Sequence, residues 1–67
     1  GFVMEFKQLY THIRSSQGLS YKEALKVIAE ATNRSEDSVK GWIIGTPERA
    51  IPENTLKYLN LIFKETP

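Results

Sequence analysis

Cysteine is absent from the sequence, and histidine occurs once, as His12. Without thiols the chain has no disulfide, no thiolate metal site and no thiol nucleophile. One imidazole is too few for a zinc site of the usual kind. We therefore expect no metal ion, and we expect His12 to lie on the surface of its helix.

Long apolar runs are also lacking. No stretch approaches the ~18 apolar residues of a membrane span, and no signal-peptide pattern is visible. Together with the lack of cysteine, this favours a cytoplasmic protein without a membrane partner. Gly1, Phe2 and Val3 precede Met4, and we interpret them as a cloning remnant.

The chain has little length and little net charge. Its 67 residues suffice for one small domain, so we expect a single domain over 1–67. Nine basic side chains against eight acidic ones leave a net charge of +1, far from the strong basicity of many nucleic-acid binders. The charge is uneven, because residues 1–34 carry five basic and three acidic groups, whereas residues 35–67 carry four and five.

No arrangement typical of an enzyme can be recognised. The sequence shows no nucleophile paired with a base, no convergent carboxylates and no glycine-rich phosphate loop. A pocket of ~300 Å³ is also difficult to form in so short a chain. We expect no catalytic residue, no cofactor and no small-molecule substrate.

Apolar residues recur three and four positions apart, which predicts helices and no strand. The first helix is expected from about Met4 to Ser15 and the second from Tyr21 to about Ala31. A third, at about 36–44, is followed by a loop at 46–51 and by a fourth helix with Pro52 at its first position. None of these helices is long enough to be stable alone, so they must pack on one another.

Local signals mark where the helices begin and end. Ser20 and Glu23 have the spacing of a capping box at the start of the second helix. Asn33 is a residue that tolerates left-handed backbone, which suits the turn after that helix. Ser35 is the expected N-cap of the third helix, and Gly45 is its expected stop.

The apolar side chains indicate which helix faces form the core. Trp42, the one tryptophan, is expected to anchor the core with its indole N–H near the edge. Tyr58 and Leu61 fall off the apolar face of the fourth helix, either as spare hydrophobic surface or as a wider core stripe. That apolar face consists of Leu56, Leu59, Ile62 and Phe63.

The segment from Ala29 to Gly45 has a spacing typical of a helix-turn-helix. Two helices that cross closely need a small residue at the crossing, here Ala29. The turn needs a residue that accepts left-handed backbone, here Asn33. The second helix must insert apolar side chains into the core, here Val39 and Trp42, and must then stop at Gly45.

With Ile28 before Ala29, these residues resemble the lambda-repressor-like, or Cro-type, DNA-binding domains. Their typical run is a Leu-Ala pair, a turn glycine, an Ile or Val, a Trp and a closing Gly. Asn33 replaces the usual glycine, and the helix after Leu19 is about one turn longer at its start than the family pattern. The resemblance implies an all-α bundle of four to five helices with its motif at about 25–45.

The resemblance also implies sequence-specific binding to double-stranded DNA by a transcriptional regulator, of the phage or mobile-element repressor kind. The third helix would lie in the major groove. One such domain covers only ~600–1,000 Å² of DNA-contacting surface, so we expect a homodimer that pairs through the fourth helix. The residues placed at the DNA are Lys22, Arg34, Ser35, Glu36, Asp37, Ser38, Lys40, Gly41 and Arg49.

The resemblance gives these residues different roles. Arg34 and Lys40 would contact phosphate or guanine, and Arg49, in the loop after the third helix, is the foremost phosphate candidate. Gly41 would be exposed and permit close approach of the DNA. Ile44 would touch a thymine methyl group, or would serve the core or the dimer.

Glu36 and Asp37 leave two interpretations open. A carboxylate can accept a hydrogen bond from the cytosine amino group, but it can also simply stabilise the positive end of a helix. These acids and the low net charge support an alternative function, a small helical protein-interaction module such as an antirepressor or adaptor without DNA binding. Duplex affinity that falls steeply with salt would favour the DNA-binding hypothesis.

Overall fold

The computed structural model describes residues 3–64 of the chain. Within them lie four α-helices, α1 (Phe6–Gln17), α2 (Tyr21–Thr32), α3 (Glu36–Ile44) and α4 (Glu53–Leu59). A 3₁₀ turn, η1 (Pro47–Arg49), precedes α4, and a π-helical turn, η2 (Asn60–Lys64), continues it. No strand occurs between residues 3 and 64, so the prediction of an all-α chain is confirmed for this part.

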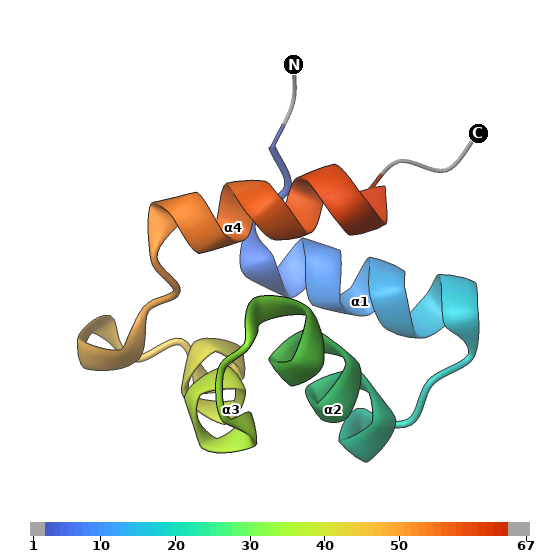
Figure 1. The fold of residues 1–67 in the computed structure, drawn as a ribbon, viewed down its shortest axis with the longest axis horizontal. Helices are drawn as coiled ribbons and strands as arrows, with labels where there is room; N and C mark the ends of the chain where they lie inside the picture. The colour runs from blue at the N-terminus through green and yellow to red at the C-terminus, as the bar shows by residue number, and fades with distance from the viewer. Residues whose placement is uncertain (1–2, 65–67) are drawn as a thin grey trace.

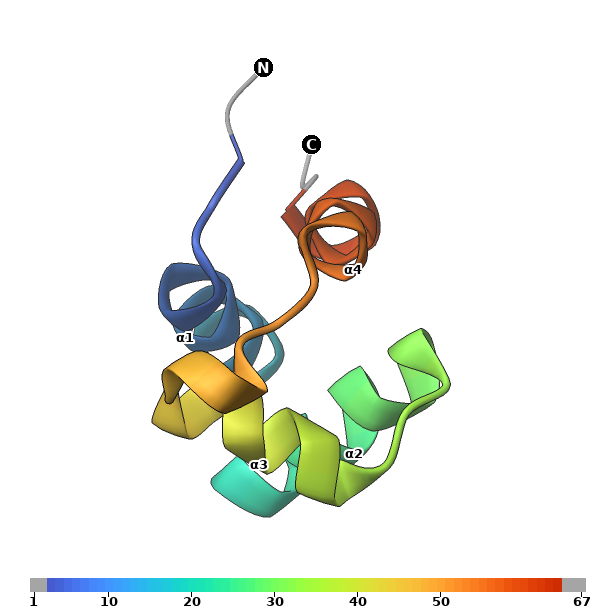
Figure 2. The ribbon, with the colours of Figure 1, turned by 90° about the vertical axis from the view of Figure 1, so that its left-hand side faces the viewer.

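The helices surround one small core. Figure 1 shows α1 between α4 on one side and the pair of α2 and α3 on the other. Figure 2 shows the same helices from the left-hand side of that view, with α3 crossing beside α2 and with α4 above it. In agreement with this central position, α1 contacts α2, α3 and η2. No helix of the described residues is long and apolar enough to cross a membrane.

The predicted ends of α2 and α3 are confirmed. The Ser20 Oγ accepts from the backbone N–H of Glu23 at 3.2 Å, and Glu23 Oε1 accepts from the N–H of Ser20 at 2.8 Å. Asn33 ends α2 with a φ of 57°, and Ser35 caps α3. Gly45 ends α3 with a φ of 80°. These signals could be predicted because each involves residues within one helical turn of one another.

Two helix boundaries differ from the prediction. The first helix begins and ends two residues later, since Glu5 is its N-cap and Gly18, with a φ of 64°, is its C-cap. Pro52 is the N-cap of α4 and not its first residue, because its ψ of 144° is extended. Gly1 and Phe2, two of the three residues interpreted as a cloning remnant, lie outside the described residues.

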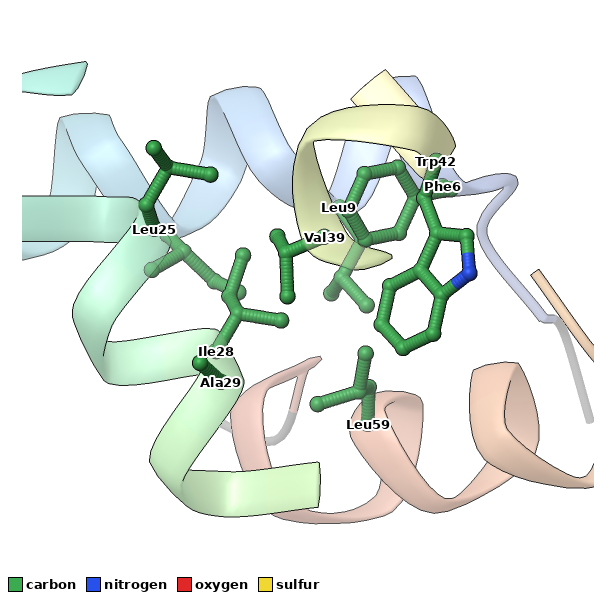
Figure 3. Close-up of a cluster of buried hydrophobic side chains, with 9 residues drawn as sticks. Phe6, Leu9, Leu25, Ile28, Ala29, Val39, Trp42 and Leu59 are labelled. Carbon is green, nitrogen blue, oxygen red and sulfur yellow. The ribbon is translucent and has the colours of Figure 1, made fainter. Parts of the chain in front are cut away.

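The core is built on Trp42, as predicted. Its indole meets the ring of Phe6 edge-on, with 5.9 Å between the ring centroids and 77° between the planes. Figure 3 shows Leu9, Val39 and Leu59 beside these rings, with the indole nitrogen directed away from Val39. Leu9, Val39 and Leu59 have no exposed surface, so three different helices close the core around the aromatic pair.

The prediction that His12 lies on the surface is not confirmed. Its side chain is half-buried, and its Nε2 atom is buried without a hydrogen-bond partner among residues 3–64. His12 directly precedes Ile13, which is fully buried in the core, so it lies at the border between the buried and the exposed side of α1.

The predicted apolar face of the fourth helix is only partly correct. Leu59 is fully buried and Leu56 and Phe63 are half-buried, but Ile62 is 43% exposed. The winding changes at Asn60 from α to π, which rotates the following side chains relative to an ideal α-helix.

Asn60 takes a buried position that the sequence pattern did not reveal. Its Oδ1 accepts from the N–H of Met4 at 2.7 Å, and its Nδ2 donates to the carbonyls of Met4 at 3.1 Å and Leu56 at 2.9 Å. Both polar atoms of the buried amide are therefore bonded, and they tie Met4, two residues before α1, to the end of α4.

Candidate nucleic-acid interface

The predicted motif residues lie where α2 and α3 meet. Ala29 is buried at the contact between the two helices, and Val39 and Trp42 direct α3 into the core. The left-handed Asn33 reverses the chain direction, and the N–H of Arg34 donates to the Ala29 carbonyl at 3.0 Å. The two helices are thus joined by a tight, internally hydrogen-bonded turn (Figure 1).

The outward face of α3 is polar with one apolar side chain. Glu36, Asp37 and Lys40 are exposed, and Ile44 is 67% exposed at the end of the helix. On an α-helix these four residues share one side, because their angular positions fall within about 100° of each other at ~3.6 residues per turn. The outward face of α3 therefore carries two acids, one base and one isoleucine.

Arg49 is fixed to this helix by Asp37. Its Nη2 atom donates to Asp37 Oδ2 at 2.7 Å and to the backbone carbonyl of Asp37 at 2.7 Å. The ion pair is exposed, with 44% of the Arg49 side chain and 80% of the Asp37 side chain accessible. Arg49, the foremost candidate for a phosphate contact, is thus already paired with Asp37, an acid of the same surface.

Gly41 is buried, which contradicts the expectation that it would be exposed to DNA. The Arg49 side chain covers it. A Cβ atom at Gly41 would lie 2.5 Å from Arg49 Nε and 2.8 Å from Arg49 Cζ. The glycine therefore permits the close approach of an arginine of its own chain.

The two serines of the predicted interface are bound to each other. Ser35 Oγ accepts from the N–H of Ser38 at 3.2 Å and donates to Ser38 Oγ at 3.1 Å. Ser35 is exposed, whereas Ser38 is half-buried. Their hydroxyl groups primarily complete the start of α3, and only Ser35 remains broadly accessible to a ligand.

The other two predicted cations lie at opposite ends of α2. Arg34 is exposed in the turn and lines a shallow hollow together with Lys26, Glu30 and Glu36. Lys22 is exposed in the first turn of α2, at the end remote from the turn. The structure therefore gathers Arg34, Lys40 and Arg49 near α3 and leaves Lys22 at the far end of α2.

Sequence reasoning missed the pairing of Asp37 with Arg49. The residues are separated by 12 positions, and a loop joins their elements, so no periodicity relates them. One signal was available: Gly41 occupies the interior of a helix, where glycine is unfavourable and requires a packing reason.

No group of three or more His, Cys, Asp or Glu side chains capable of holding a metal ion occurs in the described part of the chain. Comparison with models of protein families finds no match for this sequence, and comparisons with curated proteins and with solved structures find no significant match. The resemblance carried by the residues from Ala29 to Gly45 therefore stays a prediction.

Proposed function

We propose that this chain is a lambda-repressor-like domain that binds specific double-stranded DNA and regulates transcription. The observation that carries the proposal is the joint of α2 and α3, with Ala29 at the helix contact and Asn33 in left-handed backbone. It holds α3 at the edge of the molecule with one side in the core and the other side exposed (Figure 2). A helix exposed in this manner has the width that the major groove of B-DNA admits.

The charges around α3 support contact with the DNA backbone. Lys40 projects from the outward face of the helix, Arg34 precedes its start, and Arg49 reaches back from η1 to the first turn at Asp37. In this proposal Lys40 contacts phosphate or a guanine edge, Arg34 contacts phosphate at the turn, and Lys22 contacts phosphate at the start of α2.

A homodimer completes the proposed function. One domain of this size makes too few base contacts for strong specificity, and a two-fold dimer doubles them on half-sites about one DNA turn apart. Tyr58, Leu61 and Ile62 form an exposed apolar patch, which we call the α4 patch. The α4 patch is our proposed dimer surface.

The decisive test is a selection from random duplex DNA, followed by titration of the selected duplex at several salt concentrations. Log affinity should fall linearly with log salt, by about 0.9 in slope for each phosphate contacted. Lys40→Ala should weaken binding. The matched control is Lys57→Ala, because Lys57 is also an exposed helical lysine but lies on α4, where it pairs with Glu53 at 3.7 Å. Equal effects of the two substitutions would overturn the assignment of α3.

A second candidate is a protein-interaction module, and the pairing of Arg49 with Asp37 favours it. With Arg49 paired to Asp37, the outward face of α3 offers one lysine, the exposed Ile44 and Glu36, an acid with no ion pair among the described residues. Such a mixed surface is ordinary for a protein partner. If no selected or random duplex binds at low salt, DNA binding is excluded and this candidate takes its place.

A further inference from the structure

The side chain of Arg49 packs against α3 at Gly41 and Asp37. Its Nη2 atom donates to both Asp37 Oδ2 and the Asp37 carbonyl, each at 2.7 Å. The close approach depends on Gly41, since a Cβ there would lie 2.5 Å from Arg49 Nε. Glycine is among the least favourable residues for the interior of a helix, so this position has an evident packing purpose.

The pairing determines what Arg49 can offer to a ligand. A guanidinium binds phosphate or a guanine edge most strongly with two parallel N–H groups, either Nε with Nη2 or Nη1 with Nη2. Both arrangements use Nη2. Because Nη2 already donates to two oxygens of Asp37, Arg49 must leave Asp37 before it can make a bidentate contact.

We propose that Asp37 is a built-in competitor that withholds Arg49 from DNA until a well-fitting sequence replaces it. This inference rests on the proposed function. In the unbound protein Asp37 holds Arg49 over Gly41, and in the specific complex a phosphate or a guanine edge takes the place of the Asp37 carboxylate. Exchange is feasible because exposed ion pairs contribute little net stability.

The competitor sets a threshold for contact by Arg49. Release of Arg49 gives up its two hydrogen bonds to Asp37, and this cost is the same on every sequence. Only a duplex that offers Arg49 a good contact offsets this cost. Asp37 therefore lowers the affinity for DNA, and it acts through Arg49.

The test is a double-mutant cycle in which affinity is measured for the selected duplex and for a random duplex at fixed salt. Asp37→Asn keeps the size of the side chain and removes its charge. It should tighten binding to the selected duplex by about two- to fivefold, as the strength of an exposed ion pair allows, and binding to the random duplex by no more than that. In an Arg49→Ala background, most of this gain should disappear. Thermal unfolding of each variant verifies that all are folded.

Simple repulsion between Asp37 and phosphate predicts the opposite pattern. In the Arg49→Ala background the carboxylate is no longer neutralised, so Asp37→Asn would gain at least as much there as in the presence of Arg49. Glu36→Gln is the matched control, because Glu36 is the neighbouring exposed acid in the same turn and has no ion pair among the described residues. Its effect should be the same with and without Arg49.

The outcomes separate the two proposals. If the unsubstituted protein binds no duplex at low salt, the proposed function fails and the competitor fails with it. If the protein binds DNA but Asp37→Asn gains equally in both backgrounds, the competitor alone is overturned. Weaker binding by Asp37→Asn would also overturn it, since Asp37 would then orient Arg49 toward the DNA.

Discussion

Asn60 clamps the backbone of Met4 from both sides: its Oδ1 accepts from the Met4 N–H, and its Nδ2 donates to the Met4 carbonyl. The two residues are 56 positions apart, and the clamp joins the start of α1 to η2. The Asn60 amide is the partner of both the N–H and the carbonyl of Met4. Removal of the amide therefore leaves these two backbone groups without their partners.

Asn60→Ala should therefore lower the free energy of unfolding by about 1–3 kcal/mol, the usual penalty for buried polar groups that lose their partners. Urea denaturation followed by circular dichroism measures this change. Asn54→Ala is the control, because Asn54 is an exposed asparagine on α4. If both variants unfold at the same urea concentration, the clamp does not stabilise the fold.

The sequence predicts contacts between residues that are close along the chain. It does not predict contacts between residues that are far apart along the chain. The capping box of Ser20 and Glu23 and the left-handed Asn33 are local, so residue type and spacing suffice. The bonds from Arg49 to Asp37 and from Asn60 to Met4 depend on how the loops return, which no periodicity encodes. The site on α3 therefore stays a prediction, and the pairing of Arg49 with Asp37 beside it was not foreseen.

Gly41 and Gly45 should respond differently to alanine. Gly41→Ala adds a methyl group that displaces a flexible, exposed arginine side chain, while alanine favours the helix by up to ~1 kcal/mol. We expect unchanged or increased stability. Gly45→Ala forces a side chain into left-handed backbone at a φ of 80° and should cost roughly 1–2 kcal/mol.

Urea denaturation of both glycine variants tests this difference. In Gly41→Ala the Arg49 side chain should also leave Asp37, which NMR resonances of the Arg49 Nε–H group report directly. Comparable loss of stability in both variants would show that Arg49 cannot move away from α3.

Trp42→Ala should largely unfold the domain. Truncation of a buried aromatic side chain costs about 3–5 kcal/mol, which approaches the whole stability expected of so small a chain at ~0.05–0.15 kcal/mol per residue. Far-UV circular dichroism at 25 °C should show loss of helix. Tyr58→Ala removes an exposed aromatic ring and should leave the helix content unchanged.

Asn33 should be replaceable by glycine and not by alanine. Its φ of 57° lies in the left-handed region, which glycine enters freely and alanine enters at a cost of roughly 1–2 kcal/mol. Asn33→Gly should therefore stay close to the original midpoint of unfolding, whereas Asn33→Ala should unfold at lower urea. An equal midpoint for the two variants would mean that the turn can adopt another backbone conformation.

The α4 patch should determine the oligomeric state, and Leu61 is the residue best placed to test it because 76% of its surface is exposed. Leu61→Asp removes no core contact of the single domain, so the fold should persist, but a carboxylate would be buried without a partner in the dimer. Sedimentation equilibrium should show a dimer for the original protein and a monomer for Leu61→Asp. Ile44→Asp is the control, because Ile44 is similarly exposed but lies on α3, and it should leave the dimer intact. A monomeric original protein, or a dimer that survives Leu61→Asp, would place any self-association elsewhere on the molecule.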